Sequence, residues 1–356
     1  EFMGVGHFQI GSISVRILSF HDVPINANFW QARLKAAMEV REAIDVIRPA
    51  EKVDTDKHNT VNTTYRLVHG EGDNLPGLIV DVYGTTCVMQ AHSVGMHVSR
   101  YEIADALRNI MGDKIDSIYY KSETTLPFKA ELGQENGFIY GNTDNDIAIE
   151  NGLKFHIDWL KGQKTGFFID QRENRSLLEH YAKGRTVLNM FCYTGGFSVY
   201  AMRGNAKLVH SVDSSAKAIE LTNQNVELNF PNDNRHEAFC EDAFKFLNAN
   251  ENKYDLIVLD PPAFAKHRAA LHNALKGYTR LNAKGFECIK PGGLLFTFSC
   301  SQVVTKDQFR NAVFTAAAQA GRKVRIMHQL HQPADHPINI FHPEGEYLKG
   351  LVLYVE

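Results

Sequence analysis

The stretch TVLNMFCYTGGFSVYA, residues 186–201, decides the fold of this chain. Residues 186–191 form a short apolar run of strand length, residues 192–196 are small and turn-prone, and residues 197–202 predict the start of a helix. Gly195 and Gly196 carry no side chain, so a ligand can approach the backbone of the turn closely. The N-terminus of the following helix presents unpaired N–H groups to an anionic or polar ligand. The stretch therefore predicts a strand, a glycine turn and a helix around a ligand site.

An acidic residue after the next apolar run narrows the class of ligand. The run LVHSVD ends at Asp213, roughly 20 residues past the glycines, where a carboxylate suits the two hydroxyls of a ribose. The full three-glycine dinucleotide pattern is absent. We therefore favour a nucleoside-containing cofactor over a plain tight turn followed by a solvated Asp213. These residues alone do not exclude a dinucleotide.

Strand and helix patterns alternate from Thr186 to the end of the chain. The strand-like runs are VLNMF, KLVHSVD, HEAFC, YDLIVLD, GLLFTFS, VRIMHQL and LKGLVLYVE, and helices are expected at about 197–204, 215–229, 241–249, 269–289 and 305–320. This alternation predicts a doubly wound parallel α/β sheet. No helix fits between the last two strands, so the last strand is expected to be antiparallel. Such a seven-stranded sheet resembles the outline of the class I S-adenosylmethionine (SAM) methyltransferases.

Two segments precede this sheet. Residues 1–24 hold one or two strands within residues 8–20 and predict a fragment of a β module. Residues 25–150 predict a small α+β domain, with helices at about 29–47 and 98–111, a strand at 117–120 and irregular structure at 122–145. Asn151–Gly152 predicts the turn of a hairpin. Residues 151–356 are expected to form the cofactor-binding domain.

The composition is that of an ordinary globular protein, with 44% hydrophobic residues, 22% charged residues and a net charge of −3. No apolar run approaches the ~20 residues of a membrane span, and the five scattered cysteines form no zinc or disulfide pattern. These features favour a cytoplasmic protein with no membrane and no metal partner, and they leave a homodimer open. A net charge of −3 gives no indication of nucleic-acid binding, so any RNA-binding surface would be a local patch of basic residues.

Two aspartates follow later strands of the predicted sheet. Asp242, in CEDAF, closes the third strand, where a carboxylate or its neighbouring backbone can bind an adenine amino group. A helix N-cap is an equally good interpretation, and both roles can hold together. Asp260, in LDPPAF, precedes Pro261 and Pro262, which make a stiff turn. At this carboxyl edge of the sheet Asp260 can hold a planar base, and a plain strand-ending turn is the alternative.

A cysteine lies at the same edge. Cys300 ends the fifth strand in FTFSCSQ, one strand over from Asp260. A buried structural cysteine is the commoner case in proteins. The position of Cys300 faces the expected cofactor cleft, however, and favours a nucleophilic thiolate. Cys192 is the competing thiol, and its place in the glycine turn indicates that it lines the cofactor.

Three further groups of polar residues can be interpreted as structural or as functional. In QKTGFFIDQRENR, residues 163–175, Asp170 and Glu173 predict a capping box for a helix that runs to Tyr181. The histidines of residues 331–342 lack compact zinc spacing and predict a structural connection. A basic group after the prolines either contacts phosphate or forms a solvated face. Its members are Lys266, His267, Arg268, Lys276 and Arg280.

Together these motifs resemble the large-subunit ribosomal RNA cytosine-5 methyltransferases that combine a PUA domain, a central α/β domain and a SAM-binding domain. The motifs are GEGDNLPGLIVD, KTGFFIDQREN, NMFCYTGGFS, SVDSS, LDPPAF, FTFSCS, and ADHP followed by PEGEYLKG. They run through nearly the whole chain. The resemblance implies a partial PUA-like segment at 1–24, a central domain at 25–150 that positions RNA, and a methyltransferase domain at 151–356.

The resemblance also implies particular roles for particular residues. It implies SAM as the cofactor, ribosomal RNA as the partner, Cys300 as the nucleophile and Asp260 as the second catalytic residue. Implied cofactor contacts come from Thr165, Gln171, Phe191, Tyr193, Thr194, Gly195, Gly196, Asp213, Ser214, Asp242, Ala243 and Asp260. Implied substrate contacts come from Pro261, Pro262, Lys266 and Arg268. A related branch carries a second cysteine where this chain has Ala263, which leaves open the base that ends the covalent intermediate.

The implied reaction forms 5-methylcytidine. A Cys300 thiolate adds to carbon 6 of cytosine, carbon 5 becomes enamine-like and takes the methyl group, and loss of the carbon 5 proton and of the thiol restores the ring. One alternative is a SAM methyltransferase that acts on another RNA atom, such as a guanine nitrogen, with a structural Cys300. The other is a non-catalytic RNA-binding protein on the same fold, which the set Gly195, Asp213, Asp260 and Cys300 disfavours.

Overall fold

The computed structural model describes residues 1–11, 13–47, 61–127, 132–133 and 135–356. The chain divides into two compact units, Glu1–Ile169 with Pro333–Gly345, and Asp170–Gln332 with Glu346–Glu356. This division differs from the expected boundary after residue 150. That boundary falls in the turn between β8 (Ile147–Glu150) and β9 (Leu153–His156), which pair as an antiparallel hairpin and stay together in the first unit. The hairpin itself is confirmed, with Asn151 at φ 48° and Gly152 at φ 80°.

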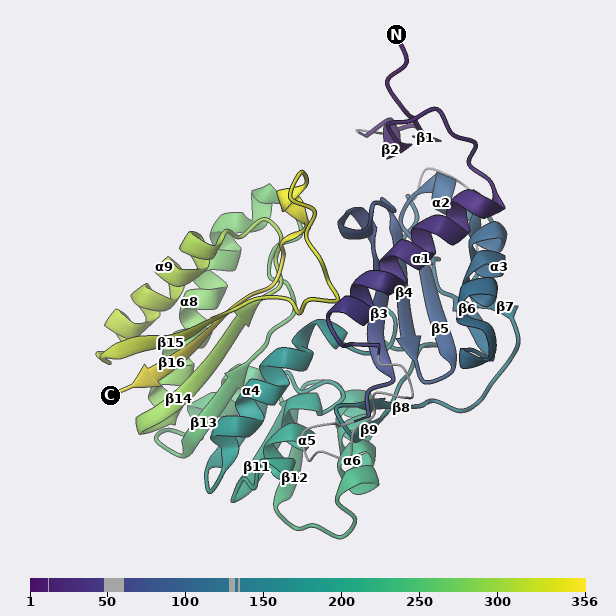
Figure 1. Cartoon of the computed structure of the whole chain (residues 1–356). Helices are drawn as coiled ribbons and strands as arrows, with labels where there is room; N and C mark the ends of the chain where they lie inside the picture. Colours follow the sequence, from purple (N-terminus) through teal and green to yellow (C-terminus); the bar gives the residue numbers. More distant parts are fainter. Residues whose placement is uncertain (12, 48–60, 128–131, 134) are drawn as a thin grey trace. The chain divides into compact units, whose positions relative to one another are not determined.

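The second unit contains the predicted seven-stranded sheet, in the order β12-β11-β10-β13-β14-β16-β15 (Figure 1). The pairs among β10 to β14 are parallel, and β16 runs antiparallel to both β14 and β15. The class I methyltransferase fold and its antiparallel last strand are thus confirmed. The strands are β10 (Thr186–Met190), β11 (Leu208–Asp213), β12 (His236–Cys240), β13 (Tyr254–Leu259), β14 (Ile289–Ser299), β15 (Val324–Leu330) and β16 (Lys349–Val355).

Two groups of helices pack on this sheet. One comprises α4 (Arg172–Ala182), α5 (Gly196–Arg203) and α6 (Ala216–Asn229), and the other comprises α7 (Ala243–Asn248), α8 (Leu271–Cys288) and α9 (Lys306–Gln319). Within each group neighbouring helices contact one another, as α8 and α9 do in Figure 1. The central strands β10 and β13 are buried along nearly their whole length, as expected for strands of a sheet that helices cover. Ile257, Leu295 and Phe309 are examples of the buried core between β13, β14 and α9.

The parallel strands bring their carboxyl ends to one edge of the sheet, which is where ligands bind in this architecture. Asp213 is the last residue of β11, Asp260 follows β13, and Cys300 follows β14. β13 and β14 are direct neighbours, with Leu259 opposite Thr297 in the register. The fold therefore gathers residues that lie far apart in the sequence along one edge.

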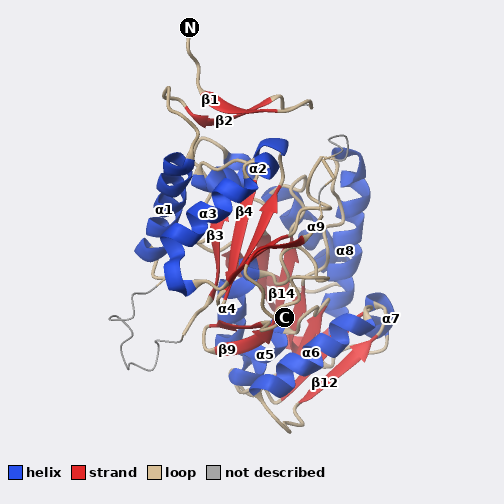
Figure 2. Ribbon diagram, turned by 90° about the vertical axis from the view of Figure 1, so that its right-hand side faces the viewer, coloured by secondary structure: helices blue, strands red, loops and turns tan. Residues whose placement is uncertain are grey.

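The first unit contains a mixed five-stranded sheet with helices packed on it (Figure 2). Its strands are β3 (Thr64–His69), β4 (Leu78–Tyr83), β5 (Thr86–Ala91), β6 (Ser117–Tyr120) and β7 (Gly137–Tyr140). Its helices are α1 (Ala27–Ala43), α2 (Val94–Val98) and α3 (Arg100–Met111). The hairpin of β1 (Val5–Phe8) and β2 (Val15–Ser19) precedes them. The predicted α+β character of this part of the chain is present.

Four local predictions differ from the structure. Residues 137–140 form β7 rather than irregular structure, because they pair with β6. The first helix ends at Ala43 rather than near Ile47, since Asp45 adopts φ 57°. The second helix is two helices separated at Ser99. The predicted capping box at Asp170 is wrong, because Gln171 is the N-cap of α4 and Asp170 instead accepts a 2.6 Å hydrogen bond from the Tyr347 hydroxyl.

Candidate cofactor and catalytic site

The turn after β10 has an unusual backbone. Phe191 (φ 58°), Tyr193 (φ 47°) and Gly195 (φ 73°) all lie in the left-handed region. For the two aromatic residues this conformation costs about 1–3 kcal/mol each. A Cβ on Gly195 would lie 2.7 Å from Cγ2 of Thr222, so only glycine fits there. Backbone strain of this kind persists where the surroundings fix it, and it is concentrated at ligand sites.

Helix α6 supplies the groups that hold this turn. The Thr222 hydroxyl donates to the carbonyl of Tyr193 at 3.0 Å, and Nδ2 of Asn225 donates to the carbonyl of Thr194 at 2.8 Å. Thr222 and Asn225 are fully buried. Gly196 opens α5 directly after the turn, with the side chain of Arg175 against it. The predicted cofactor residues of the turn therefore have a rigid support.

Asp213 is tied to the same turn. Its Oδ2 accepts a 3.1 Å hydrogen bond from the backbone N–H of Tyr193, and its Oδ1 accepts a 2.9 Å bond from Ser215. The carboxylate is half-buried, and the next residue, Ser214, is exposed. Each carboxylate oxygen can accept more than one hydrogen bond, so Asp213 keeps capacity for hydroxyl donors such as those of a ribose. The structure thus brings Asp213 into direct contact with the glycine turn after β10.

Asp242 has the role of a helix cap. Its Oδ1 accepts 3.0 Å hydrogen bonds from the N–H groups of Phe244 and Lys245, at the start of α7. The interpretation of Asp242 as a helix N-cap is therefore confirmed. Asp242 is exposed and Ala243 is half-buried, so the cap leaves part of the carboxylate accessible. A cofactor contact from Asp242 stays a prediction.

Asp260 is oriented by α4. Its Oδ2 accepts a 3.0 Å hydrogen bond from Nε2 of Gln171, whose Oε1 accepts a 2.7 Å bond from Nδ2 of Asn174. Gln171 and Asn174 are both buried, whereas Asp260 is half-buried. The family resemblance implied a cofactor contact for Gln171. In the structure its side-chain amide binds the predicted catalytic carboxylate.

The segment after Asp260 turns from the core to the surface. Pro261 is buried and Pro262 is exposed. Lys266 and Arg268 are exposed, and Arg268 begins the short helix η6 (Arg268–Ala270). The exposed cations sit a few residues from Asp260 in the sequence, where a phosphate contact remains a prediction.

Cys300 differs from the other cysteines in its surroundings. Cys87, Cys192 and Cys288 are buried, and burial raises the pKa of each thiol to about 12. Cys192, the competing thiol, also contacts the Thr222 hydroxyl at 3.5 Å. Cys300 is half-buried at the end of β14, and Cys240 is exposed. Cys300 combines partial exposure with a position at the carboxyl end of β14, beside the strand that Asp260 follows.

Thr165 belongs to the first unit, where it is fully buried. Its hydroxyl donates a 2.6 Å hydrogen bond to Oδ2 of Asp81 and lies 2.8 Å from the Tyr83 hydroxyl. The Thr165 hydroxyl thus hydrogen-bonds to side chains of its own unit. The predicted cofactor contact of Thr165 gains no support from this position.

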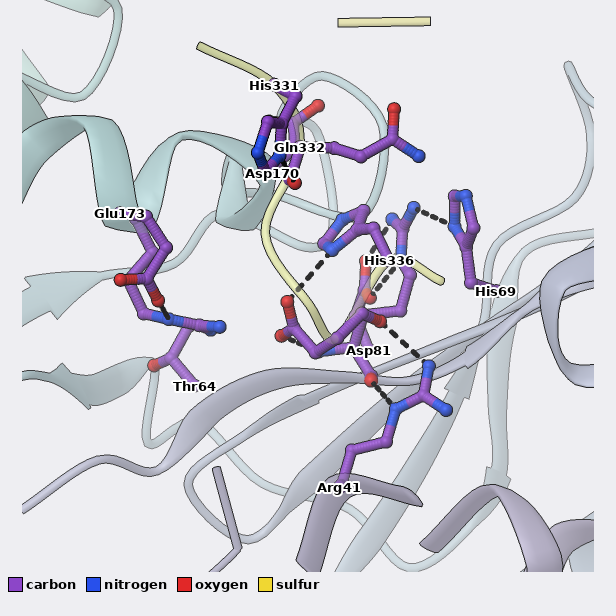
Figure 3. Close-up of polar contacts among 12 residues, drawn as sticks. Arg41, Thr64, His69, Asp81, Asp170, Glu173, His331, Gln332 and His336 are labelled. Carbon is purple, nitrogen blue, oxygen red and sulfur yellow. Dashed lines mark hydrogen bonds and ion pairs between the residues drawn. The ribbon is translucent and has the colours of Figure 1, made fainter. Parts of the chain in front are cut away.

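A buried polar network in the first unit was not predicted (Figure 3). Arg41 pairs with Asp73 and donates a 2.7 Å bond to the carbonyl of Asp335. Arg66 pairs with Asp81 at 2.7 Å, and its backbone N–H donates to Asp335. The motifs that contain these acids, GEGDNLPGLIVD and ADHP, were visible in the sequence. Their mutual contact was not, because residues 73 and 335 are far apart in the chain.

The described residues contain no group of three or more His, Cys, Asp or Glu side chains that could hold a metal ion. His336, from the histidine-rich segment, lies 3.1 Å from Oδ1 of Asp335. No described helix combines the length and the apolar character that a membrane crossing requires.

Comparisons with known proteins agree with this geometry. A family model described as S-adenosylmethionine-dependent methyltransferase matches residues 138–344. The ribosomal RNA large subunit methyltransferase I of Tolumonas auensis is 40% identical over 348 residues, covering 96% of this chain and 84% of that protein. The protein of the same name from Alteromonas mediterranea is 37% identical over 361 residues, covering 100% and 87%. The crystal structure of SMU.776 in complex with SAH has a TM-score of 0.83 at 24% identity, covering 99% and 88%.

The fold and the carboxyl-edge site define a class I SAM-dependent methyltransferase. The chain belongs to the family of the ribosomal RNA large subunit methyltransferase I proteins.

The residues at the edge fit SAM. The strained turn is held in one conformation by α6 and so offers a fixed backbone to a ligand, and Asp213 offers acceptors to hydroxyl groups. When bound, SAM supplies a methyl group activated by a sulfonium centre. The turn and Asp213 are the groups that would hold the cofactor, and Gln171 holds Asp260.

Proposed function

We propose that this protein methylates carbon 5 of a cytosine in large-subunit ribosomal RNA, with Cys300 as the nucleophile. The proposal depends on the position of Cys300, which is half-buried and directly follows β14. Asp260 directly follows β13, the strand that pairs with β14. The names of the relatives, which are 37–40% identical, support ribosomal RNA as the substrate.

A nucleophile is needed because carbon 5 of cytosine is a poor nucleophile within an aromatic ring. The Cys300 thiolate forms a bond from Sγ to carbon 6, and the electron pair of the carbon 5–carbon 6 double bond moves to carbon 5. Carbon 5 then forms its bond to the methyl group, and the sulfonium leaves as a neutral thioether. Loss of the carbon 5 proton to a base re-forms the double bond and expels the thiolate.

Asp260 is proposed to hold the target base. A carboxylate accepts a hydrogen bond from the exocyclic amino group of cytosine, and this contact fixes the ring relative to Cys300. Gln171 donates to Oδ2 at 3.0 Å and so limits rotation of the carboxylate. A target base in folded RNA would have to be unstacked first or lie in a single-stranded region. Lys266 and Arg268, both exposed, are proposed to contact phosphate, and the central domain is proposed to position the RNA.

The experiment uses ribosomal RNA from cells that lack the protein, with 5-fluorocytosine at the target position. Fluorine cannot leave as a proton does, so the adduct should be trapped after methyl transfer. We expect a covalent protein–RNA species with the wild type and none with Cys300→Ala, which should also lose methylation. Cys192→Ala is the matched control and should still form the adduct.

Two outcomes would overturn the proposal. One is a Cys300→Ala protein that methylates carbon 5 at the wild-type rate, because the thiol would then be dispensable. The other is a methyl group that mapping finds on a different RNA atom, such as a guanine nitrogen. Calorimetric titration of SAM into each variant distinguishes a loss of catalysis from a loss of cofactor binding.

A further inference from the structure

Lys349 is a buried lysine that the proposed reaction does not yet use. It is the first residue of β16, and its exposed fraction is only 5%. In the antiparallel register it lies opposite Ser299, the last residue of β14. Its Nζ donates a 2.6 Å hydrogen bond to the carbonyl of Ser301. Lys349 therefore contacts both residues that flank Cys300 in the sequence.

The charge of Lys349 has no carboxylate partner among the described residues. The nearest candidate along the chain, Glu346, instead pairs with Lys306 at 2.5 Å. A buried ammonium group without a counter-ion is costly, and proteins keep such groups mainly where they serve a function. Burial lowers the pKa of Lys349 to about 8, while Cys300 and Glu346 raise it and Lys306 lowers it. Of the two groups that raise this pKa, Cys300 has the larger effect, and it lies between the two residues that Lys349 contacts.

The other groups around Lys349 do not replace Cys300 in this role. Tyr278 of α8 contacts Ser299 and Ser301, and burial raises the pKa of its phenol, which therefore stays neutral. A pocket that Lys349 lines also includes Lys306, Asp307, Arg310 and His331. Asp307 pairs with Arg310 at 3.1 Å on the exposed side of α9.

We propose that the ammonium group of Lys349 is the counter-ion of the Cys300 thiolate and thereby activates this nucleophile. The inference rests on the proposed function of Cys300. Only the thiolate is nucleophilic, and a nearby fixed cation favours it over the thiol. The thiol proton leaves to solvent, Lys349 keeps its own proton, and the ion pair replaces an unpaired cation. Lys349 acts through Cys300 and is a positioning residue.

The test measures the ionisation of Cys300 directly. The protein is alkylated with iodoacetamide over a range of pH values, and the modified Cys300 peptide is quantified by mass spectrometry. In Lys349→Met, which keeps the length of the side chain without its charge, we expect the pH midpoint of Cys300 alkylation to rise by about one unit or more. At neutral pH this corresponds to roughly 10-fold slower alkylation. Exposed Cys240 is the internal control and should react equally in both proteins.

Two further variants make the result specific. Lys349→Arg keeps the charge and should restore at least part of the low midpoint. Lys306→Met removes an exposed lysine from the same region and should leave the Cys300 midpoint within about 0.3 units of the wild type. Circular dichroism and SAM titration establish that each variant is folded. An unchanged Cys300 midpoint in a folded Lys349→Met protein overturns the inference.

This measurement separates the inference from the proposed function. The alkylation midpoint does not depend on RNA, on SAM or on turnover. If Cys300→Ala methylates normally, the proposed reaction fails while the alkylation result for Lys349 stands by itself. If Cys300→Ala is inactive but Lys349→Met alkylates as the wild type does, the nucleophile stands and Lys349 is not its counter-ion.

Discussion

The side-chain amide of Gln171 donates a 3.0 Å hydrogen bond to Oδ2 of Asp260, and the opposite end of that amide is also held. Nδ2 of Asn174 donates to Oε1 of Gln171 at 2.7 Å. Because a carboxylate can only accept, the Nε2 end of the glutamine amide must face Asp260, and its Oε1 end then accepts from Asn174. The carboxylate that is proposed to hold the target base is therefore oriented by a buried pair of side chains from the start of α4.

Gln171→Leu should lower the methylation rate more than it weakens cofactor binding. The substitution removes the donor to Asp260 at similar side-chain size, and loss of one hydrogen bond to a charged group costs about 1.5–3 kcal/mol. We expect kcat to fall by roughly 10-fold or more, with SAM affinity changed less than about 3-fold. Single-turnover methylation and calorimetry check the two quantities. A large loss of SAM affinity with unchanged kcat would instead place Gln171 on the cofactor.

Asp213→Ala should weaken SAM binding. Asp213 closes β11 and is fixed by the N–H groups of Tyr193 and Ser215. Loss of the ribose contacts should cost roughly 1.5–3 kcal/mol, which is about 10- to 150-fold in Kd. Asp233→Ala is a suitable control, because Asp233 pairs with Arg235 away from the turn. Calorimetric titration gives both constants, and equal affinity in a folded Asp213→Ala protein would refute the assignment.

Two substitutions at Asp242 separate its cap from a cofactor contact. Asp242→Ala removes the acceptor for Phe244 and Lys245 and should lower the free energy of unfolding by about 1 kcal/mol. Asp242→Ser keeps an N-cap and should be nearly as stable as the wild type. If Asp242 also binds adenine, both variants lose SAM affinity. If Asp242→Ser keeps both the stability and the SAM affinity of the wild type, the residue is a cap alone.

Much of the second unit could be predicted from the sequence because its signals are local. The turn at residues 191–196 and the strand that ends at Asp213 lie within a short stretch of chain, and the strand–helix alternation repeats regularly. The antiparallel last strand followed from the missing helix before it. Local signals failed where pairing decides structure, as for β7, which is a strand because β6 lies beside it.

Contacts between distant residues explain the rest of what the sequence did not reveal. Asp170 looked like a cap, yet its carboxylate accepts from the Tyr347 hydroxyl, 177 residues away. Gln171 and Asp260 are separated by 89 residues, and Lys349 and Ser301 by 48. The residue types were informative about chemistry at single positions. Which side chains meet depends on the order of strands in the sheet, and no local pattern contains that order.

Arg41→Met should destabilise the first unit strongly. Arg41 is fully buried, pairs with Asp73 and donates to the carbonyl of Asp335, so its removal leaves a buried carboxylate short of its cation. Such a loss costs about 3–5 kcal/mol. Arg108→Met is the matched control, because the Arg108–Asp105 pair is exposed and should contribute less than about 0.5 kcal/mol. Urea unfolding measures both, and a small change for Arg41→Met would show that the network relaxes without it.

Lys349 should give the folded protein a distinctive dependence of stability on pH. Burial lowers its pKa from 10.5 to about 8 in the folded protein, whereas the unfolded chain keeps the ordinary value. Between these two values the unfolded chain binds more protons, so the free energy of unfolding rises with pH through this window. Below pH 8 both states are protonated, and the folded protein carries the cost of burial that remains after the favourable effects of Cys300 and Glu346.

Lys349→Met removes this cost, so the variant should be more stable than the wild type at neutral pH, by up to about 3 kcal/mol. The difference should shrink as the pH rises through the window and vanish above pH 10.5, where the wild-type amine is neutral in both states. Urea unfolding of the two proteins below pH 8 and near pH 10.5 gives the difference directly. Lys306→Met should show no such trend, since Lys306 is more than half exposed. The alternative result is a difference in the free energy of unfolding that stays constant across the window. It would mean that Lys349 has its ordinary pKa in the folded protein, so that burial does not disfavour its charge.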